Sequence, residues 1–450
     1  MLSRTVSIAL AVLGSVACFP TNRAAAQAVK PTIFVANNSA LEGSVTTYRL
    51  DARGTPSFVS KFVIGERDPS DPPISTTNAL AIDLSPNGRL LAVTHFTTID
   101  GGRLTILRVA ADGTLSVVAS ETGIASSFDC AWIGDEIVAI TRGSGGNGGI
   151  ATYAVDAPDG SIDEADFLRL SGTVSSFDRH PNGIWLLAGE TDANQIYSVE
   201  IDPGSGAITL LQALATGFAP FDVTINNAGT RAYAAESSTG REEIVFAVDI
   251  DPSTGKLAPA RVGPWPVFGD RPFNIAISPD DSVAYVTFKL FGNDDYIGSY
   301  DIASDGDLIS TTNRDAIGGS FRFGDAQTLS LGSRDILLYT DFLEGLHSFG
   351  IDNDASFDQP NGPPVPTGGP SGWYFATWTG SGCPADLSSP TDPGVPDGVL
   401  TGADFFEFLA RFQAGDLVVD YSRPTNPGVP DGVLTGADFF EFLNLFRAGC

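Results

Sequence analysis

Four side chains in the body of the chain are suited to acid–base hydrolysis: Glu190, Glu236, His95 and Arg142. Glu190 or Glu236 could act as the general base and His95 as a proton shuttle. Arg142 could stabilise an oxyanion or hold a carboxylate. The alternative is structural, since such groups also cap strand ends and bond to neighbouring elements. The sequence therefore predicts a hydrolytic site at these residues and leaves a structural use open.

A second group of acids lies near the C-terminus, in two copies of one segment. Residues 390–415 and 424–449 are identical at 22 of 26 positions, with an offset of 34. The tail is therefore a tandem repeat. Each copy has an Asp-Gly pair and a later Asp at the spacing of the second half of a calcium loop. The predicted ligands are Asp397, the Val399 carbonyl and Asp404, then Asp431, the Val433 carbonyl and Asp438.

The first half of each loop is longer than in a standard calcium loop. The nearest acids upstream are Asp386 and Asp420, each 11 residues before the Asp of the Asp-Gly pair. We include both as predicted ligands, because hard oxygen donors suit Ca²⁺ better than a transition metal. The alternative is a metal-free module in which the Asp residues only cap helices.

An amphipathic helix is expected after each loop. In the first copy Phe405, Phe408, Leu409 and Phe412 share one face, Thr401 and Asp404 can cap the start, and Gly415 ends the helix. Cys383 and Cys450 bracket the whole tail, which predicts a disulfide that clamps a small module. Cys130 lies in an apolar run and is predicted to be a buried free thiol, although a disulfide to Cys130 stays open.

The residues before the tail contain seven weak repeats of a strand pattern. Apolar strands flank corners such as Ser85-Pro86-Asn87-Gly88 and Ser278-Pro279-Asp280-Asp281, which supply hairpin dihedrals. Each unit continues with a second hairpin, and four strands per repeat are typical of a propeller blade. Ile33 begins a unit without its own leading strand, and residues 373–378 form a strand without a partner. We expect these two to complete one blade and close the ring.

The propeller geometry would gather polar residues at one mouth of a central channel. The start of a blade's innermost strand and the end of its second strand open on the same face. Innermost strands are predicted to start at Asp129, Asp178, Asp222 and Asn274. Second strands are predicted to end at Asn37, His95, Arg142, Glu190, Glu236 and Asp341.

At this level the body resembles the seven-bladed propeller lactonase family, whose blades carry Pro-His, an apolar strand, a Pro-Asp-Gly corner and a Tyr-Val-x-Asn strand. In this chain Pro220-Phe221 and Pro272-Phe273 replace Pro-His, and Asn37 keeps the strand-ending Asn. The resemblance covers about residues 31–380. It implies a propeller and, as one reading, lactone hydrolysis.

The repeated loop and helix resemble the dockerin family. Gly449-Cys450 together with Cys383 resembles the variant that ends exported planctomycete-type proteins. The resemblance implies two bound Ca²⁺ ions and attachment to a cohesin or an equivalent surface anchor.

Composition and the N-terminus indicate export and exclude some partners. Arg4, the apolar run Val6–Phe19 and Ala26-Gln27-Ala28 are typical of a cleaved signal peptide, with acylation of Cys18 as the alternative. The net charge of −29 argues against binding nucleic acid or anionic lipid. No later run is long enough for a transmembrane segment. We therefore expect an extracellular, cell-surface or periplasmic protein.

The sequence thus predicts an all-β fold: a signal peptide at 1–28, a seven-bladed β-propeller at 29–380, and a dockerin-like calcium module at 381–450. The first functional reading is an exported propeller that binds a small molecule or protein on one face and is anchored by its tail. The second is a lactone hydrolase tethered by the same tail. A propeller that serves only as a scaffold is a third.

Overall fold

The computed structural model describes the propeller strands and most of their connections, together with two C-terminal helices. Described residues are 31–378, 402–414, 419 and 434–448, without the segments 39–41, 67–77, 96–101, 111–112, 125–126, 144–147, 158, 237–243, 261–262, 267–271, 289–295, 317–323, 332–333, 342–344, 352–356, 361–364 and 367–371. The signal peptide with Cys18, the ligands Asp386, Asp397, Val399, Asp420, Asp431 and Val433, and the pair Cys383 and Cys450 all lie outside the described residues.

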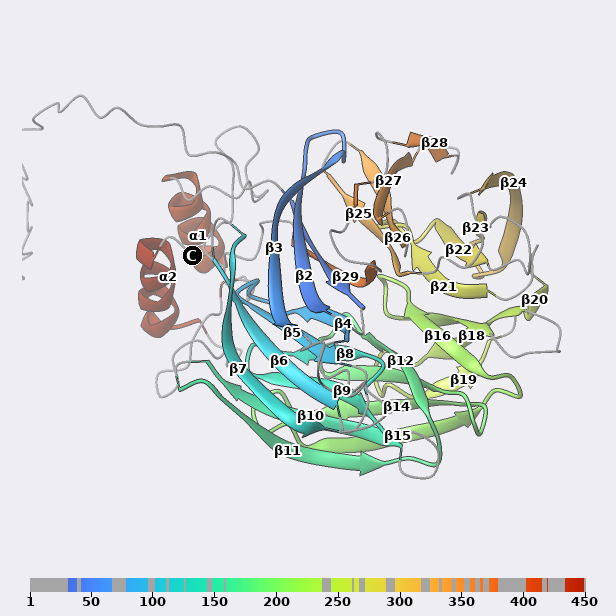
Figure 1. Ribbon diagram of the computed structural model, residues 1–450, viewed down its shortest axis with the longest axis horizontal. Coiled ribbons are helices and arrows are strands. Elements are labelled where there is room, and N and C mark those ends of the chain that lie inside the picture. Colours follow the sequence, from blue (N-terminus) through green and yellow to red (C-terminus); the bar gives the residue numbers. More distant parts are fainter. Residues whose placement is uncertain are drawn as a thin grey trace, which may run out of the picture.

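Seven antiparallel sheets are arranged as the blades of a propeller, so the predicted all-β fold is confirmed (Figure 1). We number the blades in chain order. Blade 1 has the strand order β29-β1-β2-β3, blades 2 to 4 contain β4–β7, β8–β11 and β12–β15, and blades 5 to 7 contain β16–β20, β21–β24 and β25–β28.

Strands at the same position in their blades have related roles. The innermost strands are β29 (Gly372–Trp378), β4 (Ala79–Leu84), β8 (Cys130–Ile133), β12 (Val174–Arg179), β16 (Pro220–Ile225), β21 (Pro272–Ile277) and β25 (Ala326–Ser330). The second strands are β1 (Thr32–Asn37), β5 (Leu90–His95), β9 (Ile137–Arg142), β13 (Trp185–Glu190), β17 (Arg231–Glu236), β22 (Val283–Phe288) and β26 (Asp335–Asp341).

The two outer positions of each blade face progressively more solvent. The third strands are β2 (Glu42–Leu50), β6 (Gly102–Val109), β10 (Gly149–Asp156), β14 (Gln195–Ile201), β18 (Ile244–Ile250), β23 (Tyr296–Ile302) and β27 (Gly345–Ile351). The outermost are β3 (Pro56–Glu66), β7 (Leu115–Ile124), β11 (Ser161–Arg169), β15 (Ile208–Ala215), β19 (Leu257–Pro259) beside β20 (Trp265–Pro266), β24 (Leu308–Ala316) and β28 (Phe357–Pro360). Second strands such as β5 and β13 are buried throughout, whereas the outermost strand β7 is largely exposed and β11 is a mixture of exposed and half-buried residues.

The hairpin corners join innermost to second strands as the sequence predicted. At the first of these, the Ser85 N–H donates to the Leu90 carbonyl and the Gly88 N–H to the Ser85 carbonyl. Gly88 has φ of 70°, a left-handed conformation that glycine adopts without steric cost. These corners fix the register of each hairpin and therefore which residues face the channel.

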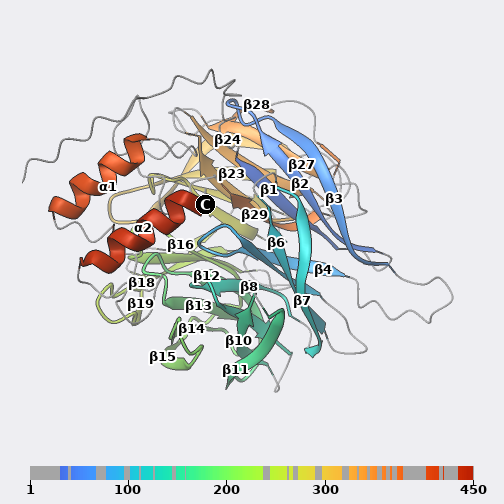
Figure 2. The same ribbon diagram turned by 90° about the vertical axis from the view of Figure 1, so that its left-hand side faces the viewer.

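Blade 1 closes the ring, and this expectation is confirmed. β29 from the end of the propeller pairs antiparallel with β1 from its start, with Thr32 opposite Trp378 and Phe34 opposite Ala376 (Figure 2). Ile33, Val35 and Phe375 pack against Leu338 of blade 7 in one buried cluster. Closure joins the two ends of the propeller through both hydrogen bonds and apolar burial.

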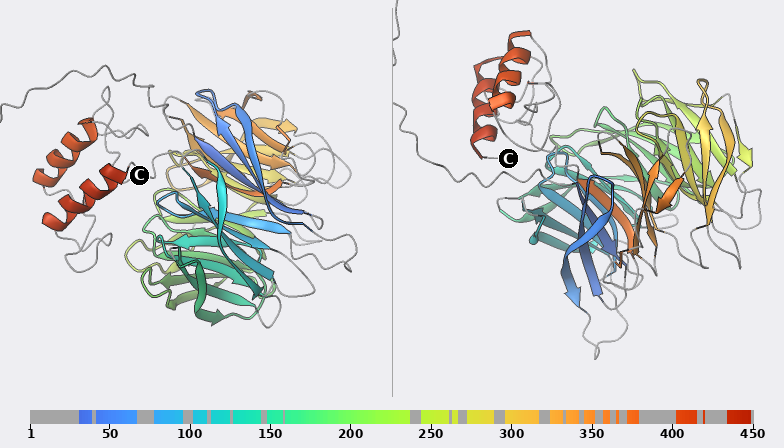
Figure 3. Two further views of the ribbon diagram at one scale, coloured as in Figure 1. Left: turned by 60° about the vertical axis from the view of Figure 1, so that its left-hand side comes forward. Right: turned by 90° about the horizontal axis from the view of Figure 1, so that it is seen from above.

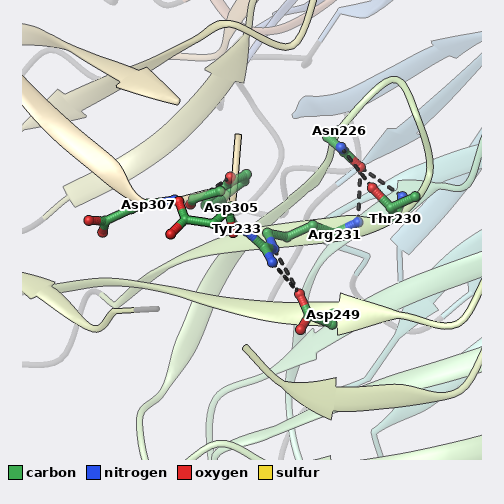
Figure 4. Close-up of polar contacts among 8 residues, drawn as sticks. Asn226, Thr230, Arg231, Tyr233, Asp249, Asp305 and Asp307 are labelled. Atoms are coloured by element: carbon green, nitrogen blue, oxygen red, sulfur yellow. Dashed lines mark hydrogen bonds and ion pairs between the residues drawn. The ribbon is translucent and has the colours of Figure 1, made fainter. Parts of the chain in front are cut away.

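Polar contacts also join neighbouring blades away from the channel. Arg231 of blade 5 forms an ion pair with Asp249 of its own blade and donates to the Asp305 carbonyl in blade 6 (Figure 4). Tyr233 donates through its hydroxyl to the Gly306 carbonyl at 3.1 Å. The turn between β23 and β24 is therefore held against β17.

The tail forms two helices, α1 (Gly402–Ala414) and α2 (Gly436–Ala448), which lie side by side (Figure 3). The Phe408 and Phe442 rings, which occupy equivalent repeat positions, are buried and stack at 4.1 Å between centroids. Leu409 differs from the expected apolar face, because it is 37% exposed. Within the described part of the chain, no helix is long and apolar enough to cross a membrane.

Candidate functional site

The centre of the propeller contains a cavity of about 580 Å³ lined by the innermost strands. Each innermost strand has a second strand on one side only, so its other edge carries backbone N–H groups that lack a sheet partner. Among the described residues, five aspartates line this cavity, and we call them the channel acids: Asp83, Asp129, Asp178, Asp222 and Asp325.

Each channel acid accepts a hydrogen bond from the innermost strand of the next blade. Asn274 of blade 6 does the same. The donors are the N–H of Trp132 to Asp83 at 2.7 Å, Phe177 to Asp129 at 2.7 Å, Ile225 to Asp178 at 2.5 Å, Ile275 to Asp222 at 2.9 Å, Ala326 to Asn274 at 2.7 Å and Phe375 to Asp325 at 3.5 Å. The side chains thus satisfy strand edges that would otherwise lack acceptors, and they are held in fixed positions.

The channel acids occupy two levels along the axis. Asp129, Asp222 and Asp325 lie opposite the penultimate residues of their second strands, Thr141, Ala235 and Thr340. Asp83 and Asp178 lie two residues closer to the corner of their hairpins, opposite Ala92 and Leu187. Residues two apart in a strand point to the same side, so both levels present carboxylates to the cavity.

Burial raises the pKa of every channel acid. The pKa of Asp178 and of Asp325 rises to about 7 and that of Asp222 to about 6. Burial is the largest cause in each case, and repulsion by the Asp222 carboxylate adds to the rise at Asp129, Asp178 and Asp325. Asp178 is half-buried as a residue and lies in the lining of the cavity.

Arg179 is the only basic side chain among the described residues that line the cavity. Its Nη1 donates to the Trp132 carbonyl at 2.7 Å, while the Trp132 indole donates to the Asp83 carbonyl at 3.1 Å. The guanidinium partly offsets the effect of burial at Asp83 and Asp178, whose pKa values still lie above the ordinary value for aspartate. Strands β4, β8 and β12 thus bring two carboxylates and one cation together.

The four residues that the sequence singled out for catalysis end four different second strands, β5, β9, β13 and β17. None of the four is among the described residues that line the central cavity. Their catalytic role stays a prediction.

These four residues differ from one another in their contacts and burial. Buried His95 lies 3.1 Å from the Thr105 hydroxyl, and buried Glu190 accepts the Asp192 N–H at 2.8 Å. Arg142 pairs with Glu164 on an outer strand, and its guanidinium lies over the Phe167 ring. Glu236 is 1% exposed.

The residues predicted to start innermost strands all line the cavity, but the predicted strand starts were partly wrong. Asp129 directly precedes β8, whereas β12 begins at Val174, so Asp178 is next to the last residue of its strand. Asp129, Asp178, Asp222 and Asn274 all line the cavity, whereas sequence reasoning missed Asp83, Asp325 and Arg179. A signal for Asp83 was present, because Asp83 and Asp178 both precede a Pro-Asn-Gly corner by three residues. Aligning the corners rather than the strand starts would have identified Asp83.

In the tail, two of the predicted calcium ligands lie within the described residues. Asp404 and Asp438 are both buried near the starts of α1 and α2. Asp438 accepts the N–H of Thr435 at 2.6 Å and the Thr435 hydroxyl at 3.1 Å, which is the predicted capping arrangement. Cys130 is a buried free thiol, as expected.

Comparisons with known proteins match the propeller. No family model and no curated protein matches the sequence. A periplasmic gluconolactonase from Pseudomonas aeruginosa is 19% identical with a TM-score of 0.60, over 77% of this chain and 98% of that one. A candidate 6-phosphogluconolactonase from Bacteroides uniformis is 15% identical with a TM-score of 0.64, over 78% and 100%. One from Bacteroides fragilis is 16% identical with a TM-score of 0.59, over 80% and 100%. These likenesses establish a shared fold.

Proposed function

We propose that the propeller hydrolyses a small lactone in its central channel. The observation that carries this proposal is the meeting of fixed carboxylates and one guanidinium in a single cavity. Three of those carboxylates have a pKa raised to about 6 or 7. A carboxylate of that pKa is suited to general acid–base work near neutral pH. The solved structures named as lactonases support this choice over other hydrolyses.

Asp178 and Arg179 are the residues that we assign to the chemistry. Asp178 takes a proton from a water molecule as the water oxygen attacks the lactone carbonyl carbon. Arg179 stabilises the negative charge that develops on the carbonyl oxygen. The ring C–O bond then breaks, the departing oxygen takes the proton from Asp178, and the product is a hydroxy acid. The Ile225 N–H holds Asp178 in place throughout.

The test is the rate of acid release from a panel of neutral lactones, measured above the spontaneous rate. Asp178→Asn keeps the acceptor for the Ile225 N–H and removes the base, so activity should fall on the order of 100-fold or more while the fold is kept. Arg179→Gln should lower kcat more than it raises KM, because its charge acts on the transition state. Loss of activity in Glu190→Gln or Glu236→Gln, with Asp178→Asn unaffected, would place the chemistry at the second-strand residues instead.

We further propose that the protein is exported and that its tail is a calcium-binding anchor. The helix pair and the buried Asp at the start of each helix support a compact duplicated module. The predicted ligands remain Asp386, Asp397, Val399 and Asp404, with Asp420, Asp431, Val433 and Asp438 in the second copy. A cohesin-like protein or another surface anchor is the partner we propose, and Cys383 with Cys450 the disulfide.

Calorimetric titration of the intact protein with Ca²⁺ tests the tail. We expect heat for two ions per chain and a higher unfolding temperature for the tail. A chain ending at residue 380 should give no such heat. If the intact protein gives no heat, calcium binding is contradicted and the tail is a metal-free module.

The reading in which the propeller only binds a ligand or partner on one face predicts a different result. Such a protein would retain a sugar or lactone without opening it. Binding without acid release, unchanged in Asp178→Asn, would favour that reading.

A further inference from the structure

We infer that the channel selects uncharged lactones and excludes phosphorylated ones. This inference rests on the proposed function and specifies its substrate class. The neighbours of known structure include one named for a neutral sugar lactone and two named for its 6-phosphate, so the fold alone does not choose between them. The negative charge of the channel wall favours the neutral lactone.

Acidic side chains extend around most of the channel. The channel acids come from blades 2, 3, 4, 5 and 7, and Asn274 occupies the corresponding place in blade 6. A ligand in the cavity therefore meets a carboxylate in nearly every direction. The whole chain also carries a formal charge of −29, so the field of the protein repels anions as they approach the channel.

The one basic side chain described in the lining can face the single charge of an oxyanion, but it does not by itself make a site for a doubly charged phosphate. Arg179 donates to the Trp132 carbonyl and lies near the carboxylates of Asp83 and Asp178. Phosphate binding normally uses several cationic or N–H donors that converge on one anion. Here the unpaired strand-edge N–H groups, which could have bound an anion, are covered by the channel acids.

A neutral lactone encounters none of this repulsion. Carboxylates and Asn274 can accept hydrogen bonds from sugar hydroxyls, which are donors. A phosphate group offers mainly acceptors and two negative charges. Placing like charges together weakens binding by on the order of 100-fold. The channel therefore fits a polyhydroxylated, uncharged ring.

The experiment compares kcat/KM for glucono-δ-lactone and its 6-phosphate with the full chain at about pH 8. This pH lies above the pKa of Asp178, Asp222 and Asp325, which is about 6 or 7, and above that of the phosphate. We expect the neutral lactone to be preferred by on the order of 100-fold. The preference should narrow at about 0.5 M NaCl, since salt screens the repulsion.

Asp222→Asn provides the decisive variant. Asn274 already fills the equivalent position in blade 6 and accepts the same backbone hydrogen bond, so the substitution keeps the bridge and removes one charge. The ratio of kcat/KM for the neutral lactone to kcat/KM for the phosphate should fall by about tenfold in this variant. The matched control is Asp163→Asn, which changes net charge equally at an exposed position of outer strand β11 and should leave the ratio unchanged.

The outcomes separate the inference from the proposed function. Equal rates on both lactones, or faster opening of the phosphate, would overturn charge exclusion and leave hydrolysis standing. If neither lactone is opened, the proposed function fails, and saturation-transfer NMR with glucitol and glucitol 6-phosphate then decides on exclusion. A signal from the phosphorylated polyol as strong as that from the neutral one would overturn it.

Discussion

At the scale of single residues, the channel acids combine two roles that usually conflict. As acceptors for the next blade they stabilise the ring, yet burial makes their ionised form unfavourable. Asn274 shows that an uncharged acceptor is sufficient for the bridge. A negative charge is therefore not needed for this hydrogen bond, and the acidity of the aspartates at the other positions is available for chemistry.

The raised pKa values predict an unusual pH dependence of stability. The pKa of Asp178 and of Asp325 is about 7 in the folded protein, against an ordinary value of 3.8 for aspartate. Between these values the folded state binds more protons than the unfolded state, so the free energy of unfolding falls as pH rises from about 4 to about 7. Urea midpoints should drop by on the order of 1 M or more over this range, because two groups contribute.

Asp325→Asn should flatten that dependence, because it removes one group that titrates. Asp163→Asn, on the exposed face of β11, should follow the wild-type curve. Stability that rises with pH across this window would show that the channel acids are ionised without penalty in the folded protein.

At the scale of elements, hairpin corners were the most informative part of the sequence. Corners such as Ser85 to Gly88 predicted where strands turn, and the structure confirms them. Local dihedral demands determine these positions, so they are visible in sequence. The set of polar residues that share a cavity depends on how neighbouring blades align with one another. A pattern within a single blade does not specify that alignment. Glu190 and Glu236 were selected for their chemistry, but the wall of the cavity is built from the preceding strands.

The contact between blades 5 and 6 predicts that a single methyl group added at Gly306 strongly lowers the stability of the protein. Gly306 has φ of 83°, and a Cβ there would lie 1.2 Å from the Arg231 Nη1. Gly306→Ala should lower the free energy of unfolding by about 2–4 kcal/mol, through backbone strain plus displacement of Arg231.

Gly183→Ala is the matched control for that substitution. Gly183 has φ of 81°, and a Cβ there would have no atom within 4 Å. It should cost only the strain, about 1 kcal/mol. Equal effects of the two substitutions would show that the Arg231 contact contributes little.

At the scale of the whole molecule, closure by β29 and the duplicated tail were both foreseeable. The repeat region has an unpaired strand at each end, which predicts that the two strands pair with each other and close the ring. The tail repeat, with 22 identities in 26 positions, is evident without a structure. The acidic wall was only partly foreseeable, since it requires all blades to be in place at once.

Closure predicts that the ring depends on residues 372–379. Their deletion exposes an edge of β1 and removes Phe375 from its cluster with blade 7. The unfolding temperature should fall by on the order of 10 °C. A chain lacking residues 402–450, which retains β29, should melt like the intact propeller, and a normal melt for the first deletion would contradict closure.

The central claim is that Asp178 opens a lactone in the channel. The most direct test is the initial rate of acid release from glucono-δ-lactone, above the spontaneous rate, by the wild type, Asp178→Asn and Glu190→Gln side by side. We expect clear acceleration by the wild type, a loss on the order of 100-fold or more in Asp178→Asn, and near wild-type rates in Glu190→Gln. Wild-type rates in Asp178→Asn would contradict that claim.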